Sequence, residues 1–213
     1  MNAGSPTLVV SGLTQLYAER RVVDDLSFSA GPGEAIALVG PNGSGKTTVL
    51  RCVVGAVSPT QGTVELAGEP VDERSAGQRR AVAALLDDLD FFPDLSVVEH
   101  LDLLARAHGD HDPRELVGAL LDEVGLTPAA DQLPGSLSSG QRRRLALASV
   151  LVRPRRLLVL DEPEQRLDTA GVDWLAERLA AEKDAGTAIV FASHHPELVE
   201  AVADQVVSLD DRS

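Results

Sequence analysis

The chain contains 213 residues, of which 44% are hydrophobic and 24% charged, and its formal net charge at pH 7 is −14. These proportions are ordinary for a soluble globular domain, no apolar run approaches the roughly 18–20 residues of a membrane-spanning helix, and no signal peptide is recognisable. Because nucleic acids are bound through lysines and arginines, the negative charge argues against such a partner, and the single cysteine, Cys52, favours a cytoplasmic location.

The first part of the chain predicts a region of β structure. Residues 8–10 and 22–28 are rich in β-forming residues and are interrupted near residues 17–19, and residues 63–66 have the pattern of another short strand. We therefore expect a small β region at the N-terminal end of the domain.

A phosphate-binding loop is the most specific signal in the sequence. Residues 40–48 fit G-x-x-x-x-G-K-[ST], follow an apolar strand at 35–39 and lead into a helix at 49–54. Backbone N–H groups of such a loop surround a triphosphate, while Lys46 reaches the β- and γ-phosphates and the Thr47 hydroxyl is a Mg²⁺ ligand. The predicted loop consists of Gly40, Pro41, Asn42, Gly43, Ser44, Gly45, Lys46, Thr47 and Thr48.

The middle of the chain predicts a helical lobe. Residues 81–86 form a further candidate strand, and the pattern from about 94 to 153 is mainly helical. We expect this lobe to be inserted into an α/β core made of residues 1–93 and 154–213. Two apolar helix faces are predicted, formed by Val98, Leu101, Leu104 and Ala105 and by Leu116, Leu120, Leu121 and Val124.

Polar residues follow two apolar strands near the C-terminus. The strand predicted at 156–161 ends in Asp161 and Glu162, and the one predicted at 188–194 ends in His194. Strands alternate here with helices near 170–183 and 197–203, and a last strand is expected at 206–209, which indicates a parallel sheet. Its carboxyl edge faces the ligand crevice, where Asp161 can hold Mg²⁺, Glu162 can act as general base and His194 is a ligand contact or a structural group.

A second helix start lies at residues 137–141, Leu-Ser-Ser-Gly-Gln. Its serine cap and exposed N–H groups would form an anion site, yet it lies far along the chain from the phosphate loop. Three arginines follow at 142–144, and their simplest interpretation is a solvated helix face rather than a basic patch.

Taken in order, these motifs resemble the nucleotide-binding domain of the ATP-binding cassette (ABC) ATPases over nearly the whole chain. The resemblance implies a P-loop α/β fold with a mainly parallel sheet, an antiparallel N-terminal β region and a helical lobe. The matching elements are Tyr17 for adenine stacking, the phosphate loop, the signature at 137–141, the Walker B strand at 157–162 with catalytic Glu162, the D-loop at 167–168 and the switch histidine His194.

The resemblance further implies ATP and Mg²⁺ as cofactors and a head-to-tail dimer, either homodimer or heterodimer. Ser138, Gly140 and Gln141 would then contact the γ-phosphate held by Lys46 of the opposite subunit, and Asp168 would lie at the same interface. Thr47, Asp87 and Asp161 would be the metal ligands.

Three residues depart from the family pattern. Asp87 stands where a glutamine is usual, Ser139 where the signature has its first glycine, and Arg166 where a small residue is usual.

We expect an active ATPase subunit of a membrane transporter, located peripherally on the inner face of the membrane, with separate permease chains. A permease helix would enter the groove near residues 91–93, although these can also be plain core residues. The alternatives are a soluble ABC ATPase without a transport role and an ATP-gated clamp with weak hydrolysis.

Overall fold

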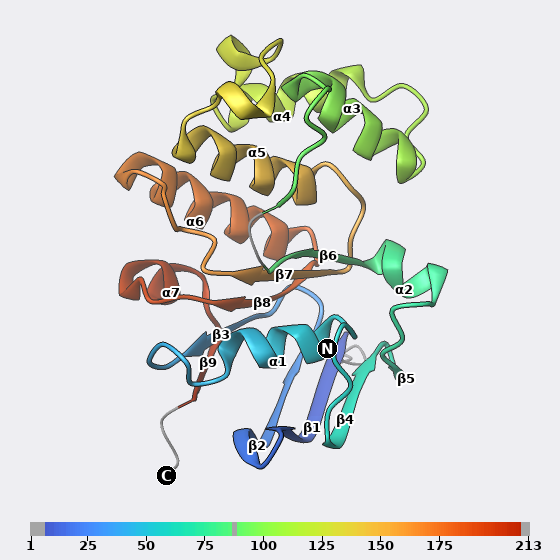
Figure 1. Cartoon of the computed structure of the whole chain (residues 1–213), viewed down its shortest axis with the longest axis vertical. Helices are drawn as coiled ribbons and strands as arrows, with labels where there is room; N and C mark the ends of the chain where they lie inside the picture. The colour runs from blue at the N-terminus through green and yellow to red at the C-terminus, as the bar shows by residue number, and fades with distance from the viewer. Residues whose placement is uncertain (1–6, 87–88, 210–213) are drawn as a thin grey trace.

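The protein, described here by a computed structural model covering residues 7–86 and 89–209, is built of stacked layers (Figure 1). An antiparallel sheet of order β2-β1-β4-β5 lies at one end. The early β region is thus confirmed, with a first strand that runs on to Tyr17. Its strands are β1 Leu8–Tyr17, β2 Arg20–Ala30, β4 Gln61–Leu66 and β5 Glu69–Pro70.

A second sheet, parallel throughout, forms the centre of the molecule in the order β6-β7-β8-β3-β9. Its central strands are buried on both faces, as their unbroken apolar sequences predicted. The parallel pairing brings the carboxyl ends of β3, β7 and β8 to one edge. The strands are β3 Ala35–Val39, β6 Val82–Leu85, β7 Leu157–Asp161, β8 Ala188–Ala192 and β9 Gln205–Ser208.

Alternate residues of each central strand enter different cores. In β7, Leu158 and Leu160 pack in the core shared with the lobe and with α6 and α7, whereas Leu157 and Val159 pack in the core shared with α1 and the antiparallel sheet. The parallel sheet is therefore the wall between two hydrophobic cores. The helices concerned are α1 Lys46–Val53, α6 Thr169–Asp184 and α7 Pro196–Val202.

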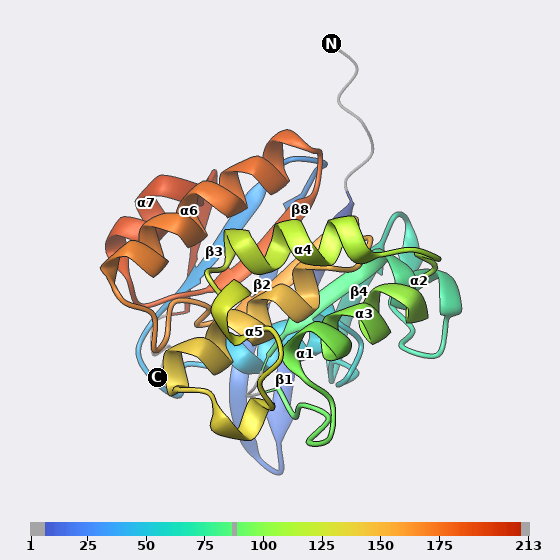
Figure 2. The same cartoon turned by 90° about the horizontal axis from the view of Figure 1, so that it is seen from above.

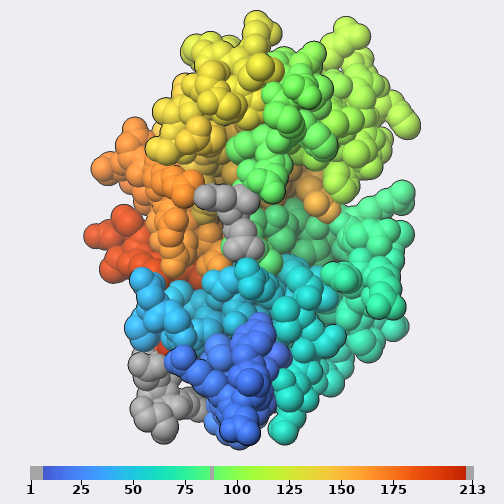
Figure 3. All heavy atoms as spheres, in the orientation of Figure 1, coloured from blue at the N-terminus to red at the C-terminus, as the bar shows by residue number. Residues whose placement is uncertain are grey.

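The lobe caps the end of the molecule opposite the antiparallel sheet, as the ribbon seen from above and the space-filling view show (Figures 2 and 3). None of its helices, nor any other in the described parts of the chain, is long and apolar enough to cross a membrane. Its elements are α3 Val97–Ala107, α4 Arg114–Glu123, the 3-10 turns Thr127–Ala129 and Pro134–Ser136, and α5 Ser139–Leu151.

The structure differs from the predicted elements in several details. Leu116 is exposed, and Val117 takes its place on the buried face of α4. The strand expected at 81–86 starts one residue late, because Ala81 ends a helix that was not predicted, α2 Ala76–Ala81. Strand β5 was also missed. The strand expected at 188–194 ends at Ala192, so that His194 lies in the loop beyond it.

A buried ion network joins helix α6 to the loop before β7. The Arg155 guanidinium forms two bonds to the Glu182 carboxylate, which also accepts hydrogen bonds from Arg178 (2.7 Å) and from the Thr187 hydroxyl (3.0 Å). Burial by itself would raise the pKa of Glu182, but the bonds and charge of Arg155, with help from Arg178, lower it below its ordinary value.

Replacing Glu182 by Ala should therefore destabilise the fold by about 3 kcal/mol, because Arg155 would be left buried without its counter-charge. The lowered pKa means that the stabilisation is fully present above about pH 4.5, the ordinary value, and is lost as the pH falls through the folded-state pKa. Urea unfolding between pH 7 and 3 measures both effects. Glu177→Ala, an exposed change on the same helix, should shift stability by less than about 0.5 kcal/mol.

Candidate functional site

The phosphate loop lies between β3 and α1, and its glycines have a steric reason. Gly40 and Gly45 have φ angles of 149° and 100°. A Cβ on Gly40 would lie 2.5 Å from the Leu209 carbonyl oxygen, and one on Gly45 would lie 2.8 Å from that of Val22. Only glycine fits these two positions, where the loop turns tightly against neighbouring backbone.

Lys46 begins helix α1 but points back into the loop. Its ammonium is buried and donates to the carbonyl oxygens of Gly40 (2.9 Å) and Pro41 (3.1 Å). The buried Ser44 hydroxyl has no hydrogen-bond partner among the described residues. Donors held in this way at a helix N-terminus suit a polyphosphate, which would replace the weaker carbonyl acceptors.

Thr47 and Asp161 meet at the base of the loop. The Thr47 hydroxyl donates to Asp161 Oδ2 at 2.5 Å, which joins the first turn of α1 to the end of β7. Two hard oxygen donors side by side fit Mg²⁺, which uses one or two protein oxygens and completes its shell with phosphate and water. Asp87, the third predicted metal ligand, lies outside the described residues.

Glu162 and His194 come from neighbouring strand ends and face each other. His194 Nε2 lies 3.2 Å from Glu162 Oε1, and the other carboxylate oxygen accepts a hydrogen bond from Gln165 Nε2. The Glu162 backbone has a φ of 44°, unusual for a residue with a side chain, and its N–H donates to the Ala192 carbonyl. Glu162 also lines the hollow formed by Val22, Asn42, Gly43, Gly45, Lys46, Thr47 and Thr48.

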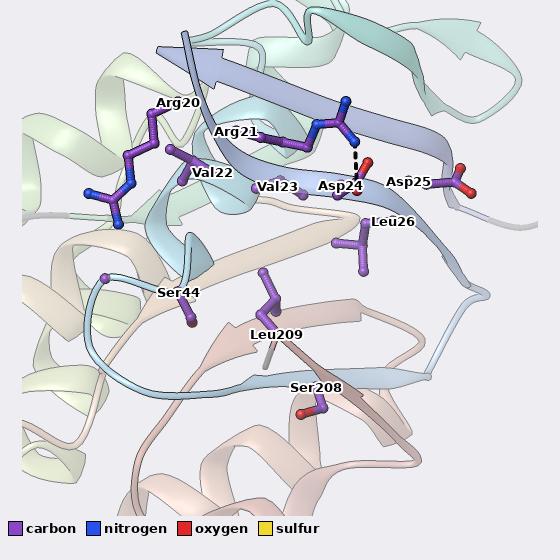
Figure 4. A pocket seen from close by; sticks show the side chains of 11 residues that line it. Arg20, Arg21, Val22, Val23, Asp24, Asp25, Leu26, Ser44, Ser208 and Leu209 are labelled. Carbon is purple, nitrogen blue, oxygen red and sulfur yellow. Dashed lines mark hydrogen bonds and ion pairs between the residues drawn. The ribbon is translucent and has the colours of Figure 1, made fainter. Parts of the chain in front are cut away.

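A second hollow adjoins the phosphate loop on the side of β2 (Figure 4). Residues 20–26 of that strand line it together with Ser44, Ser208 and Leu209, and Val22 and Gly43 line both hollows. Tyr17, the predicted adenine-stacking residue, lies at the end of β1 and exposes 46% of its surface. Its ring is accessible, but it is not among the residues that line either hollow.

The signature segment begins helix α5. Ser138 is the N-cap, and it exchanges hydrogen bonds with Gln141: the Gln141 N–H donates to the serine hydroxyl (3.2 Å), and the Ser138 N–H donates to the glutamine side-chain oxygen (2.9 Å). Ser139 is exposed, so its side chain can replace the usual glycine without a steric clash. A Cβ on Gly140 would lie 3.2 Å from the Arg166 carbonyl oxygen, which places the signature helix against the loop that follows Glu162.

Comparison with known proteins decides the family. The model of the family described as "ABC transporter" matches residues 23–165. The chain belongs to the ABC transporter family. It is 37% identical over 204 residues to the SkfA peptide export ATP-binding protein SkfE of Bacillus subtilis (strain 168), covering 95% of this chain and 84% of that protein. It is 40% identical over 199 residues to the Nod factor export ATP-binding protein I of Burkholderia thailandensis, covering 92% of this chain and 65% of that longer protein.

A solved structure shares the fold. The structure titled "Structure of ATP binding subunit of ABC transporter" superposes with a TM-score of 0.87 at 27% sequence identity, covering 95% of this chain and 85% of that one. The expected α/β fold of an ABC ATP-binding subunit is thereby confirmed.

The arginine run of this ABC subunit is not the solvated face that its sequence suggested. Arg143 is buried and donates to the carbonyl oxygens of three consecutive residues, Asp161 (3.0 Å), Glu162 (2.5 Å) and Pro163 (3.1 Å). It therefore fixes the backbone of the loop that carries Glu162. The one signal for this role in the sequence is its place three and four residues before the apolar Ala146 and Leu147 on the same helix.

The neighbouring Arg144 pairs with Asp168 at 2.9 Å. Asp168 is the N-cap of α6 and accepts the Gly171 N–H, and this bond together with Arg144 lowers its pKa. The D-loop aspartate is thus bound within its own subunit to the signature helix. Arg166 has a φ of 65°.

The two phenylalanines of the segment 91–93 differ in burial. Phe91 is partly buried and packs on the core, whereas Phe92 exposes 49% of its surface. Both rings contact His100, with centroids 5.4 and 5.5 Å away. Burial lowers the pKa of His100.

Replacing Arg143 by Lys should destabilise the protein by about 1–2 kcal/mol, because a single ammonium cannot reproduce the planar fork that serves three buried carbonyls. Urea unfolding measures the change. Arg114→Lys is the matched control, since the Arg114 side chain is 86% exposed. A stability loss in Arg143→Lys no larger than in this control would contradict the role assigned to Arg143.

Proposed function

We propose that this chain binds Mg-ATP at the edge of the parallel sheet and hydrolyses it to drive an exporter. The observation that carries the proposal is the convergence of Lys46, the Thr47–Asp161 pair and the Glu162–His194 pair at one edge. The loop amides and Lys46 would bind the triphosphate, and Thr47 with Asp161 would hold Mg²⁺, which neutralises charge on the phosphates when bound. Tyr17 would stack on the adenine ring.

Glu162 is the general base of this proposal, and His194 would orient it and contact the γ-phosphate. Both oxygens of the Glu162 carboxylate are engaged, one by His194 and the other by Gln165. Each carboxylate oxygen has a second lone pair, so Glu162 can accept a proton from the attacking water while both contacts are in place.

A second ABC subunit would complete each site. Ser138, Gly140 and Gln141 begin a helix whose N–H groups would bind the γ-phosphate held by the partner's phosphate loop. A homodimer and a heterodimer both meet this requirement. Asp168 would join the same interface, and ATP would hold the two subunits together until hydrolysis removes the bridging phosphate.

Separate permease chains are the proposed membrane partners, with the subunit on the cytoplasmic face. The names of the relatives, which are export ATP-binding proteins, support export rather than import. A hollow lined by Phe91, Pro93, Arg142 and Arg166, next to the exposed Phe92, suits a helix of the permease. The relatives' names disfavour a soluble role without transport, and an ATP-gated clamp with weak hydrolysis is the second candidate.

Replacing Glu162 by Gln should lower kcat for ATP hydrolysis at least a hundredfold and leave ATP affinity within about threefold, because the amide removes the base but keeps the shape of the site. Steady-state ATPase assays and nucleotide titration measure the two quantities. Glu177→Ala, on the exposed face of α6, is the control. Undetectable hydrolysis by the wild type, indistinguishable from that of Glu162→Gln, would reject the hydrolytic role and leave the clamp, whereas equal and substantial turnover would reject Glu162 as the base.

The transporter partner can be sought with the same variant. Tagged Glu162→Gln protein purified from detergent-solubilised native cells with Mg-ATP should retain an integral membrane protein at stoichiometric yield, because unhydrolysed ATP keeps the closed assembly together. Lys46→Ala, which should not bind the triphosphate, serves as the comparison. Recovery of ribosomes, or of the subunit alone, would count against the transporter assignment.

A further inference from the structure

Glu164 connects the loop after β7 to the loop that carries His194. Its carboxylate oxygen Oε1 accepts a hydrogen bond from the Ser193 hydroxyl at 2.6 Å and another from the His194 backbone N–H at 3.3 Å. The Ser193 hydroxyl in turn accepts the His195 N–H at 3.0 Å. Glu164 therefore anchors two residues of the histidine loop directly and a third, His195, through the Ser193 hydroxyl.

The same loop is held from the other side by strand β3. Ser193 exposes only 1% of its surface, and its N–H donates to the Leu38 carbonyl at 3.3 Å. Leu38 lies two residues before the phosphate loop. The position of His194 is thus set by the strand before the phosphate loop and by Glu164, two residues after Glu162.

A buried carboxylate oxygen at Glu164 costs more free energy than a purely structural contact would need. Its second oxygen, Oε2, is buried and accepts no hydrogen bond within the described residues, and the groups that donate to Oε1 there are a neutral hydroxyl and an amide. A carboxylate is expensive to bury in such surroundings, and an arrangement of this kind is expected where function requires it.

We propose that Glu164 is a positioning residue for His194: it fixes the loop so that the imidazole meets the Glu162 carboxylate, and it contacts neither nucleotide nor metal itself. The inference rests on the proposed ATPase function. His194 Nε2 lies 3.2 Å from Glu162 Oε1, and a displacement of about 1 Å at a reacting centre can cost a hundredfold in rate.

Replacing Glu164 by Ala should lower kcat for ATP hydrolysis about 10- to 30-fold and change KM for ATP less than threefold, because the phosphate loop and Lys46 are untouched. Glu164→Gln should recover most of the rate, to within about threefold of wild type, since its amide oxygen accepts the same two bonds more weakly. Glu200→Ala, a change on the exposed face of α7, should have no effect.

A double-mutant cycle separates positioning from a general structural role. If Glu164 acts through His194, Glu164→Ala should cause no further loss of rate in a His194→Ala background, whereas an equal loss in both backgrounds would overturn the proposal. Should Glu164→Ala fail to fold, Ser193→Ala, which removes the hydroxyl between Glu164 and the His195 N–H, takes its place in the cycle.

Amide hydrogen exchange provides a test that does not depend on turnover. The His194 and His195 amides should exchange about tenfold faster in Glu164→Ala than in wild type, and stay close to wild type in Glu164→Gln. Unchanged exchange in Glu164→Ala would overturn the proposal. If wild type hydrolyses no ATP, the proposed function fails, while the exchange rates still decide whether Glu164 holds this loop.

Discussion

The parallel pairing of β3, β7 and β8 is the constraint on which the rest of the structure depends. In this register Leu38 and Asp161 both lie beside Ala192, so the segments that follow the three strands begin at the same level of one edge. The phosphate loop, the Glu162 carboxylate and the His194 loop are those three segments. A shift of one strand by a single residue would separate them and would also exchange the side chains facing the two cores.

Arg143 links this edge to the signature helix. Its guanidinium serves three backbone carbonyls around Glu162, while Ser138, five residues earlier, caps the same helix. A buried charge bound to several carbonyls cannot leave them singly without exposing unpaired polar groups. If a nucleotide on a partner subunit displaced the start of α5, Arg143 would therefore move the backbone around Glu162, the proposed base.

Local sequence patterns predicted what local geometry determines. The strand, glycine loop and helix around Lys46 needed no tertiary information, and neither did the unbroken apolar strands. The errors arose where the rotational phase of a helix, or a contact distant in the sequence, determines which side chains are buried. Leu116 and Val117 differ by one position on α4, Arg143 faces inward because a loop lies beside it, and α2 buries none of its side chains and so shows no periodicity. The Glu164–Ser193 contact joins residues 29 positions apart and has no signature in the sequence.

The loop from Glu162 to Arg166 shows how such contacts serve chemistry. Both end residues have positive φ angles without being glycine, which costs on the order of 1 kcal/mol each. This backbone persists because the surrounding bonds over-determine it: Arg143 holds its carbonyls, Ala192 receives the Glu162 N–H, and Glu164 binds the neighbouring loop. Within the described residues, side chains alone hold the Glu162 carboxylate. The side chain of the proposed base can thus exchange its partners while the backbone that aims it stays in place, as the proposed transfer of a proton to and from this carboxylate in each cycle would require.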